Sequence, residues 1–134
     1  YDQKFATLMN AESTGNAQRK PTAGGVMQIE INNLIISPGD RPLREIVADT
    51  KSAIYVNDFS WLNPNPISGI FGAEIRNAYM IENGALTAPL KGGNLSGNIY
   101  EMLKNIDAIS KETRVVMNAQ VPYMKFKGLS LSTE

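Results

Sequence analysis

Apolar and polar residues alternate with a period of two along several stretches of this chain. Between residues 26 and 32, the apolar side chains Met27, Ile29 and Ile31 alternate with polar ones. This period predicts a half-buried strand, with one face in the core and one in solvent. The apolar run 34–36 is expected to continue the strand after a bulge at Asn32-Asn33.

Further runs of apolar and β-branched residues predict more strands, at 53–61, 70–75, 78–81, 86–90, 115–119 and 123–131. The pair Asn83-Gly84 stands between two of these runs. Asn-Gly favours a type I′ turn, whose twist matches that of two paired strands. Segments 78–81 and 86–90 are therefore expected to form a hairpin.

Apolar residues at helical spacing predict two short helices, over about residues 43–50 and 99–106. Asp40 is expected to cap the first helix, and Asn98 with Glu101 resembles a capping box at the start of the second. The Gly-rich stretch 91–98 is expected to be a flexible loop leading into that second helix.

These elements lack the long helical crossovers that parallel strands require, so the sheet is expected to be mostly antiparallel. The predicted fold is mainly β (α+β), an antiparallel barrel-like or sandwich-like sheet with about two short helices. Because no internal repeat or composition break interrupts the sequence, residues 1–134 are expected to form a single domain.

Composition removes several classes of chemistry. The chain has no histidine and no cysteine, which excludes an ordinary zinc site, a Ser-His-Asp triad and a Cys-His pair. Basic and acidic residues number 13 each, so no nucleic acid partner is expected. No apolar run approaches the roughly 20 residues that span a bilayer, so no membrane contact is expected. The protein is also expected to be cytoplasmic. The start at Tyr1, without Met or a signal segment, suggests a fragment or processed product.

An aromatic group on the predicted strand 53–61 is the first candidate for binding. Tyr55, Phe59 and Trp61 fall on one face if the strand is regular, opposite Ile54 and Val56. They could form a platform for a peptide or single-stranded nucleic acid, although aromatic residues on a strand more often belong to the core. A neutral β module suits an extended peptide added at a sheet edge. Tyr79, Asn83 and Gly84, on the predicted hairpin, complete the expected peptide-binding or interface set.

An ordered series of segments resembles the C-terminal domain of the TldD/PmbA family of peptidases, whose members are also labelled modulators of DNA gyrase. The matching segments cover nearly the whole chain and are Ser13-Thr14-Gly15-Asn16-Ala17, Asn33-Leu34-Ile35-Ile36, Pro38-Gly39-Asp40, Asn65-Pro66-Ile67-Ser68-Gly69 with Phe71, Ala78-Tyr79-Met80-Ile81-Glu82-Asn83-Gly84, Pro89-Leu90-Lys91-Gly92, Leu95-Ser96-Gly97-Asn98, Asn105-Ile106-Asp107-Ala108-Ile109, and Pro122-Tyr123-Met124-Lys125-Phe126-Lys127-Gly128-Leu129-Ser130.

The resemblance implies a two-part protein in a two-subunit assembly that cleaves small or unfolded peptides. Catalytic members carry an upstream His-Glu-x-x-x-His zinc motif and take a third zinc ligand from a cysteine of the C-terminal domain. The matching stretch here, roughly Ala108 to Glu112, has no cysteine. The resemblance therefore points to the non-catalytic, PmbA-like (TldE-like) subunit, with no catalytic or metal residue in this chain and zinc expected only in a catalytic partner.

Three roles stay open at this point. The domain could shape the peptide chamber and pair with extended peptide beside a TldD-like catalytic subunit or a second copy of itself. It could instead be a purely structural subunit interface. A direct effect on DNA gyrase, which the family label suggests, fits poorly with a chain of zero net charge.

Overall fold

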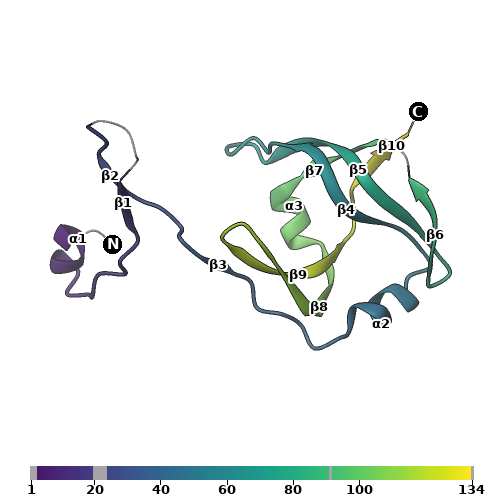
Figure 1. The fold of residues 1–134 in the computed structure, drawn as a ribbon, viewed down its shortest axis with the longest axis horizontal. Helices are drawn as coiled ribbons and strands as arrows, with labels where there is room; N and C mark the ends of the chain where they lie inside the picture. Colours follow the sequence, from purple (N-terminus) through teal and green to yellow (C-terminus); the bar gives the residue numbers. More distant parts are fainter. Residues whose placement is uncertain (1–2, 20–23, 91, 134) are drawn as a thin grey trace. The chain divides into compact units, whose positions relative to one another are not determined.

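The structure is a computed structural model that describes residues 3–19, 24–90 and 92–133. The sequence features noted at Tyr1 and Lys91 lie outside the described residues. The chain divides into two compact units, a smaller one of residues 1–36 with 115–121 and a larger one of residues 37–114 with 122–134 (Figure 1). Whether residues 1–134 fold as one cooperative domain stays a prediction.

The larger unit is built on a five-stranded antiparallel sheet. Its order is β10-β7-β5-β4, and β6 also pairs with β5. These strands are β4 (Ser52–Leu62), β5 (Ile70–Glu82), β6 (Ala85–Leu90), β7 (Asn94–Asn98) and β10 (Ser130–Ser132). Buried and exposed residues alternate along most of β5, as expected for a central strand with one face in the core. The predicted mainly β, antiparallel fold is confirmed in its sandwich-like form, since the strands of the described residues do not close into a barrel.

A small apolar core lies on one face of this sheet. Ile75, Ala78 and Leu95 are buried together. Partly buried hydrophobic side chains pack around them, namely Ile54, Val56, Phe59, Leu90 and Leu129. The core therefore joins four strands of the sheet to the segment that precedes β10.

The predicted hairpin at Asn83-Gly84 is confirmed. Glu82 pairs with Ala85 across the turn, and φ is 50° at Asn83 and 83° at Gly84. Positive φ at both central residues is the signature of a type I′ turn. The turn is tied to the start of β4, because the Asn83 and Gly84 amides donate to the carbonyls of Lys51 and Thr50 at 2.8 and 2.9 Å.

A second hairpin is formed by β8 (Ile106–Val116) and β9 (Ala119–Phe126). The short strand β3 (Leu34–Ile35) pairs with β9 in parallel, which is an exception to the antiparallel rule. The strand predicted over 115–119 is wrong, because Met117, with φ of 54°, and Asn118 form the turn of this hairpin. The strand predicted over 123–131 is likewise divided between β9 and β10.

The described residues form three short helices, where two were predicted. They are α1 (Gln3–Leu8), α2 (Leu43–Ala48) and α3 (Ile99–Lys104). None of the helices among the described residues is long and apolar enough to cross a membrane. The expected Asp40 cap is wrong, because the Leu43 amide at the start of α2 donates to the Glu112 carboxylate at 2.7 Å. A partner 69 residues away has replaced the local cap.

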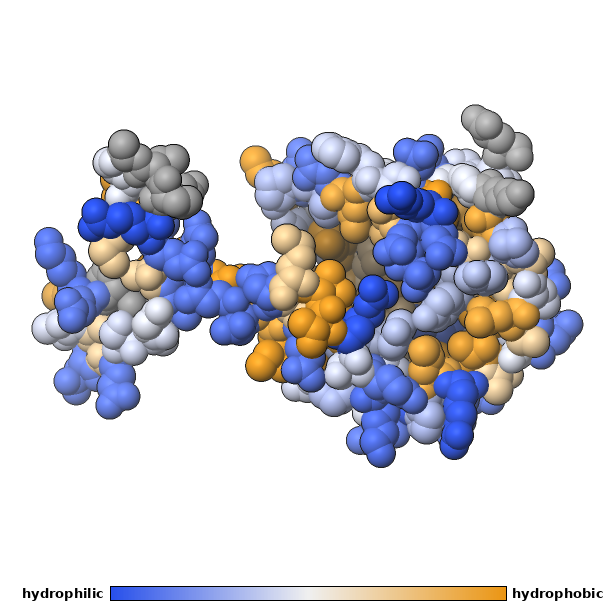
Figure 2. Space-filling view, in the orientation of Figure 1, coloured by the Kyte–Doolittle hydropathy of each residue, from blue (hydrophilic) through white to orange (hydrophobic). Residues whose placement is uncertain are grey.

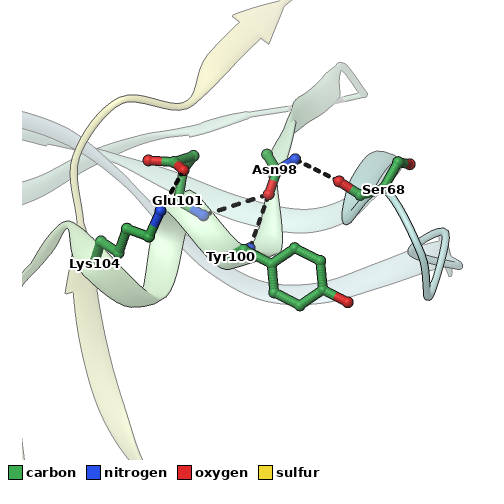
Figure 3. Close-up of polar contacts among 5 residues, drawn as sticks. All are labelled: Ser68, Asn98, Tyr100, Glu101 and Lys104. Carbon is green, nitrogen blue, oxygen red and sulfur yellow. Dashed lines mark hydrogen bonds and ion pairs between the residues drawn. The ribbon is translucent and has the colours of Figure 1, made fainter.

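The start of α3 follows the sequence prediction more closely (Figure 3). The Asn98 side-chain oxygen accepts hydrogen bonds from the amides of Tyr100 at 2.9 Å and Glu101 at 3.4 Å. The Asn98 amide group donates to the Ser68 carbonyl at 2.7 Å. Glu101 pairs with Lys104 at 2.8 Å. Asn98 therefore both caps α3 and ties it to the loop before β5.

Two other predictions need correction. The Gly-rich stretch before α3 was expected to be a flexible loop, but β7 occupies residues 94–98 and is paired on one edge with β5 and on the other with β10. The half-buried strand predicted from residue 26 is instead the short β2 (Met27–Ile29), which pairs with β1 (Ala17–Arg19) in a two-stranded sheet. All three residues of β2 are exposed, because the described part of the smaller unit supplies no layer that covers them.

Candidate functional site

A row of three tyrosines crosses the edge of the main sheet. Tyr55 of β4 stands directly opposite Tyr79 of β5, so the two side chains share a face. The ring of Tyr55 stacks on that of Tyr123 of β9, with centroids 6.2 Å apart and planes inclined by 25°. Tyr55 and Tyr123 are half-buried, and Tyr79 is exposed. We call these three residues the tyrosine row.

The predicted platform of Tyr55, Phe59 and Trp61 is not formed. The β4–β5 register shifts at three places between Val56 and Trp61, and these irregularities change the face on which Phe59 lies. Phe59 packs against the buried core with Ile54 and Val56, although it was expected to face the other way. Trp61 is exposed on the strand beyond the irregular region. Of the three aromatic residues, Tyr55 instead lies opposite Tyr79, another residue of the predicted binding set.

Asn83 and Gly84 lie at the end of the β5–β6 hairpin. Their backbone amides are already bonded to carbonyls of residues 50 and 51. These two amides are therefore not available to pair with a peptide unless the turn detaches from β4. A role for both residues in holding the hairpin against β4 follows from the contacts, and a role in binding stays a prediction.

A cavity of about 610 Å³ lies in the larger unit, between the main sheet and β9. Its size is in the range of small-molecule or side-chain pockets. Much of its wall is made of flexible or aromatic apolar side chains, including Met80, Met102, Met124, Phe59 and Phe126. Tyr55 and Tyr123 also line it, so the tyrosine row borders this space. Figure 2 shows a hollow with an apolar interior in the larger unit.

Sequence reasoning missed Tyr123 and the methionine-lined cavity. The alternation of Met124 and Phe126 with Lys125 and Lys127 was visible, but nothing local shows which strand β9 approaches. Lys125 is held by an ion pair of 3.0 Å with Asp107, and Lys127 pairs with the same carboxylate. The two ammonium groups hold the pKa of Asp107 below its ordinary value, mainly through the hydrogen bond from Lys127.

The phenol of Tyr55 has a perturbed acidity. Burial raises its pKa, and the neighbouring Tyr123 raises it further by charge and by a hydrogen bond, while Arg114 partly opposes the rise. The folded state therefore binds the phenolic proton more tightly than the unfolded state. The stability that this provides is complete below the ordinary tyrosine pKa of about 10 and is lost as the pH rises through the folded-state pKa.

A Tyr55→Phe variant tests this shift. It keeps the stacked ring and removes the titrating group. We therefore expect it to lose less free energy of unfolding than the parent sequence as the pH rises above the ordinary tyrosine pKa of about 10. Urea unfolding at a series of pH values measures the difference. Identical pH dependence in the two proteins would show that Tyr55 titrates normally.

The segment 108–112, where the resemblance places a metal-binding cysteine, forms part of β8. Ser110 is fully buried there, donating to the Glu112 carbonyl at 2.7 Å and accepting from the Tyr123 amide at 2.9 Å. The neighbouring carboxylates are also engaged, Asp107 with two lysines and Glu112 with the Leu43 amide. No group of three or more metal-binding side chains occurs among the described residues. This set of donors does not fit a zinc ion, which needs thiolate, imidazole or free carboxylate ligands.

The fold and these contacts define a sandwich-like α+β domain that carries an apolar cavity but lacks a fitting set of zinc ligands in its described part. The family model for the PmbA/TldA metallopeptidase C-terminal domain matches residues 1–133. The chain belongs to this family of metallopeptidase domains.

Similar proteins extend this assignment. Metalloprotease MJ0996 of Methanocaldococcus jannaschii is 33% identical over 112 residues, which are 84% of this chain and 24% of that protein. The crystal structure of TldE from Thermococcus kodakarensis superposes with a TM-score of 0.83 at 27% identity, over 98% of this chain and 30% of that one. A Thermotoga maritima protein named as a modulator of a DNA gyrase has a TM-score of 0.75 at 22% identity, over 98% of this chain and 29% of that one, and shares the fold. The chain thus spans about a quarter of the length of the metalloprotease that it matches.

Proposed function

We propose that this chain is the C-terminal domain of a non-catalytic, TldE-like subunit, which works beside a TldD-like catalytic subunit in a peptidase for small or unfolded peptides. One observation carries the proposal. The whole sequence lacks histidine and cysteine, although it belongs to a metallopeptidase family. The domain cannot supply the thiolate or imidazole that zinc prefers, so the metal is left to the partner. The likeness to TldE supports the same choice of subunit.

The main sheet offers a place for extended peptide. β4 is the last strand in the order β10-β7-β5-β4, so its outer edge has no partner strand in the sheet of the described residues. Such an edge can hydrogen-bond an added strand of almost any sequence, because it uses only backbone groups. The tyrosine row borders this edge and provides apolar rings with hydroxyl groups for side chains that vary.

The catalytic part of the proposal is tested with the parent protein that contains this chain. We expect the parent alone to bind no zinc through this domain and to leave an unstructured fluorogenic peptide uncut. Cleavage is expected only after a TldD-like partner is added, with the zinc bound by that partner. Metal analysis of each purified subunit and a peptidase assay measure both quantities. Zinc bound through this chain, or cleavage by the parent alone, contradicts the assignment.

Contact with peptide is tested in the assembled pair. Replacing Tyr79, which is exposed in the tyrosine row, by Ala is expected to raise KM about fivefold, equivalent to ~1 kcal/mol of binding, with kcat maintained. Leu103→Ala is the matched control, because Leu103 is exposed on α3. A purely structural interface, the alternative role, leaves KM unchanged in both variants. A direct action on gyrase receives no support from the balanced charge of 13 basic and 13 acidic residues.

A further inference from the structure

Exposed apolar side chains gather in the smaller unit around the turn of the β8–β9 hairpin. We call this set the tip cluster, and it consists of Ile31, Leu34, Ile35, Val115, Val116 and Met117. Met117 is 95% exposed and Ile35 is 69% exposed. Figure 2 shows apolar surface over the region that Figure 1 assigns to β3 and this hairpin. A concentration of exposed apolar side chains of this kind usually marks a contact with another protein surface.

Hydrogen bonds hold the members of the tip cluster next to each other. The Leu34 amide donates to the Asn118 carbonyl at 2.9 Å, and the Asn118 side chain donates to the Ile31 carbonyl at 3.0 Å. The Ile36 amide donates to the Gln120 carbonyl at 3.0 Å. The strand β3 and the hairpin turn are thus fixed together by backbone contacts. Because Leu34 pairs with Ala119 and Ile35 with Gln120, Leu34 and Ile35 point to opposite faces of this small sheet, and both are exposed. Apolar side chains of the tip cluster therefore lie uncovered on both faces.

The smaller unit has little core of its own. Among its described residues, Ala6 is the only hydrophobic residue that is buried. Its β1–β2 ribbon is a two-stranded sheet, and an isolated ribbon of two strands is marginal in water. Met27 and Ile29 of that ribbon are exposed as well. The unit therefore needs a covering surface in order to bury enough apolar area to be stable.

We propose that the part of the same polypeptide upstream of residue 1 covers the tip cluster. The matched relatives show how much chain is available, since this domain spans 30% of the Thermococcus kodakarensis TldE chain. The matching family model describes a C-terminal domain, which places the remainder before it. The upstream chain joins the smaller unit through α1, so its covering of the tip cluster is intramolecular and favoured by a millimolar effective concentration. A second subunit would have to compete with that attached surface.

Thiol labelling of the full parent protein tests the proposal. Because this chain has no cysteine, a Met117→Cys change places one thiol in the tip cluster. Ile67→Cys is the matched control, since Ile67 is 90% exposed in the larger unit. We expect the Met117→Cys thiol to react with a maleimide about 100-fold more slowly in the native parent than in the denatured parent, because a covered site must open before it can react. The Ile67→Cys thiol is expected to react at nearly the same rate in the native and denatured states. Unmodified parent protein gives the background from upstream thiols.

The occupant is identified by dilution and by addition of the catalytic subunit. Protection of Met117→Cys that is unchanged over a hundredfold dilution and without the partner supports the upstream chain. Protection that appears only at high concentration indicates a second copy, and protection that appears only with the partner indicates the other subunit; either result overturns the proposal. Rapid labelling under all conditions overturns it too. Ile35→Cys provides a second thiol in the same cluster in case the first variant folds poorly. These outcomes involve neither zinc nor hydrolysis, so they are independent of the test of the proposed function.

Discussion

Replacing Ile75 by Ala should lower the free energy of unfolding by about 2–5 kcal/mol, the usual cost of removing a large aliphatic side chain from a packed core. Ile75 is 2% exposed and packs with Ala78 and Leu95 at the centre of the main sheet. Its removal would also leave a void, because strands on both sides of β5 are held by hydrogen bonds and cannot easily close around the gap.

Urea unfolding followed through the single tryptophan, Trp61, measures this loss. Trp61 pairs with Glu74, the residue before Ile75, so its fluorescence reports the same pair of strands. Ile67→Ala removes an equal volume from an exposed loop side chain and is expected to change stability by less than about 0.5 kcal/mol. A loss below ~1 kcal/mol for Ile75→Ala would mean that the main sheet does not depend on this core.

The parts of the fold that sequence predicted well depend on neighbouring residues. The Asn83-Gly84 turn needs two residues that tolerate positive φ, and the chain supplies both at adjacent positions. The start of α3 needs a side-chain acceptor two or three residues before free amides, and Asn98 meets that requirement. Such requirements can be read within a few residues of the chain, without knowledge of the tertiary structure.

The parts that were mispredicted depend on distant partners. Glu112 replaces Asp40 at the start of α2 because β8 brings its carboxylate to the Leu43 amide. Residues 94–98 become a strand because β5 and β10 supply ladder partners on both sides, which offsets the low strand propensity of Gly and Asn. The strand β2 has the alternating pattern of a half-buried strand, but all three of its residues are exposed. Alternation predicts an apolar face, and it does not show which other part of a protein packs against that face.

The candidate site shows the same division. Tyr55 and Tyr79 were both identified from sequence, but their apposition follows from the β4–β5 register, which the turn and the bulges set together. Tyr123 was missed because its stacking on Tyr55 depends on how β9 approaches the main sheet. Phe59 was placed on the wrong face because three register irregularities follow Val56 in β4, and irregularities of this kind leave no clear sequence signal.

Replacing Gly84 by Ala should cost about 2–5 kcal/mol of unfolding free energy. At a φ of 83°, any residue with a Cβ is strained by about 1–2 kcal/mol. The new methyl group would also collide with the backbone carbonyl of Ala48 at the end of α2, with its carbon atom 3.1 Å away, and overpacking of this kind adds about 1–3 kcal/mol. Backbone cannot move aside like a flexible side chain, so the turn would separate from the helix.

Gly92→Ala separates the two causes. Gly92 has a similar φ of 77°, but a Cβ there would meet nothing within 4 Å, so this variant should lose only the strain of about 1–2 kcal/mol. Thermal or urea unfolding of the two variants in parallel gives the collision energy as their difference. Equal losses would show that the hairpin turn does not pack against α2. A larger loss for Gly84→Ala would show instead that Gly84 is required for this packing, and any effect of the variant on peptide binding would then have to be corrected for the displaced hairpin.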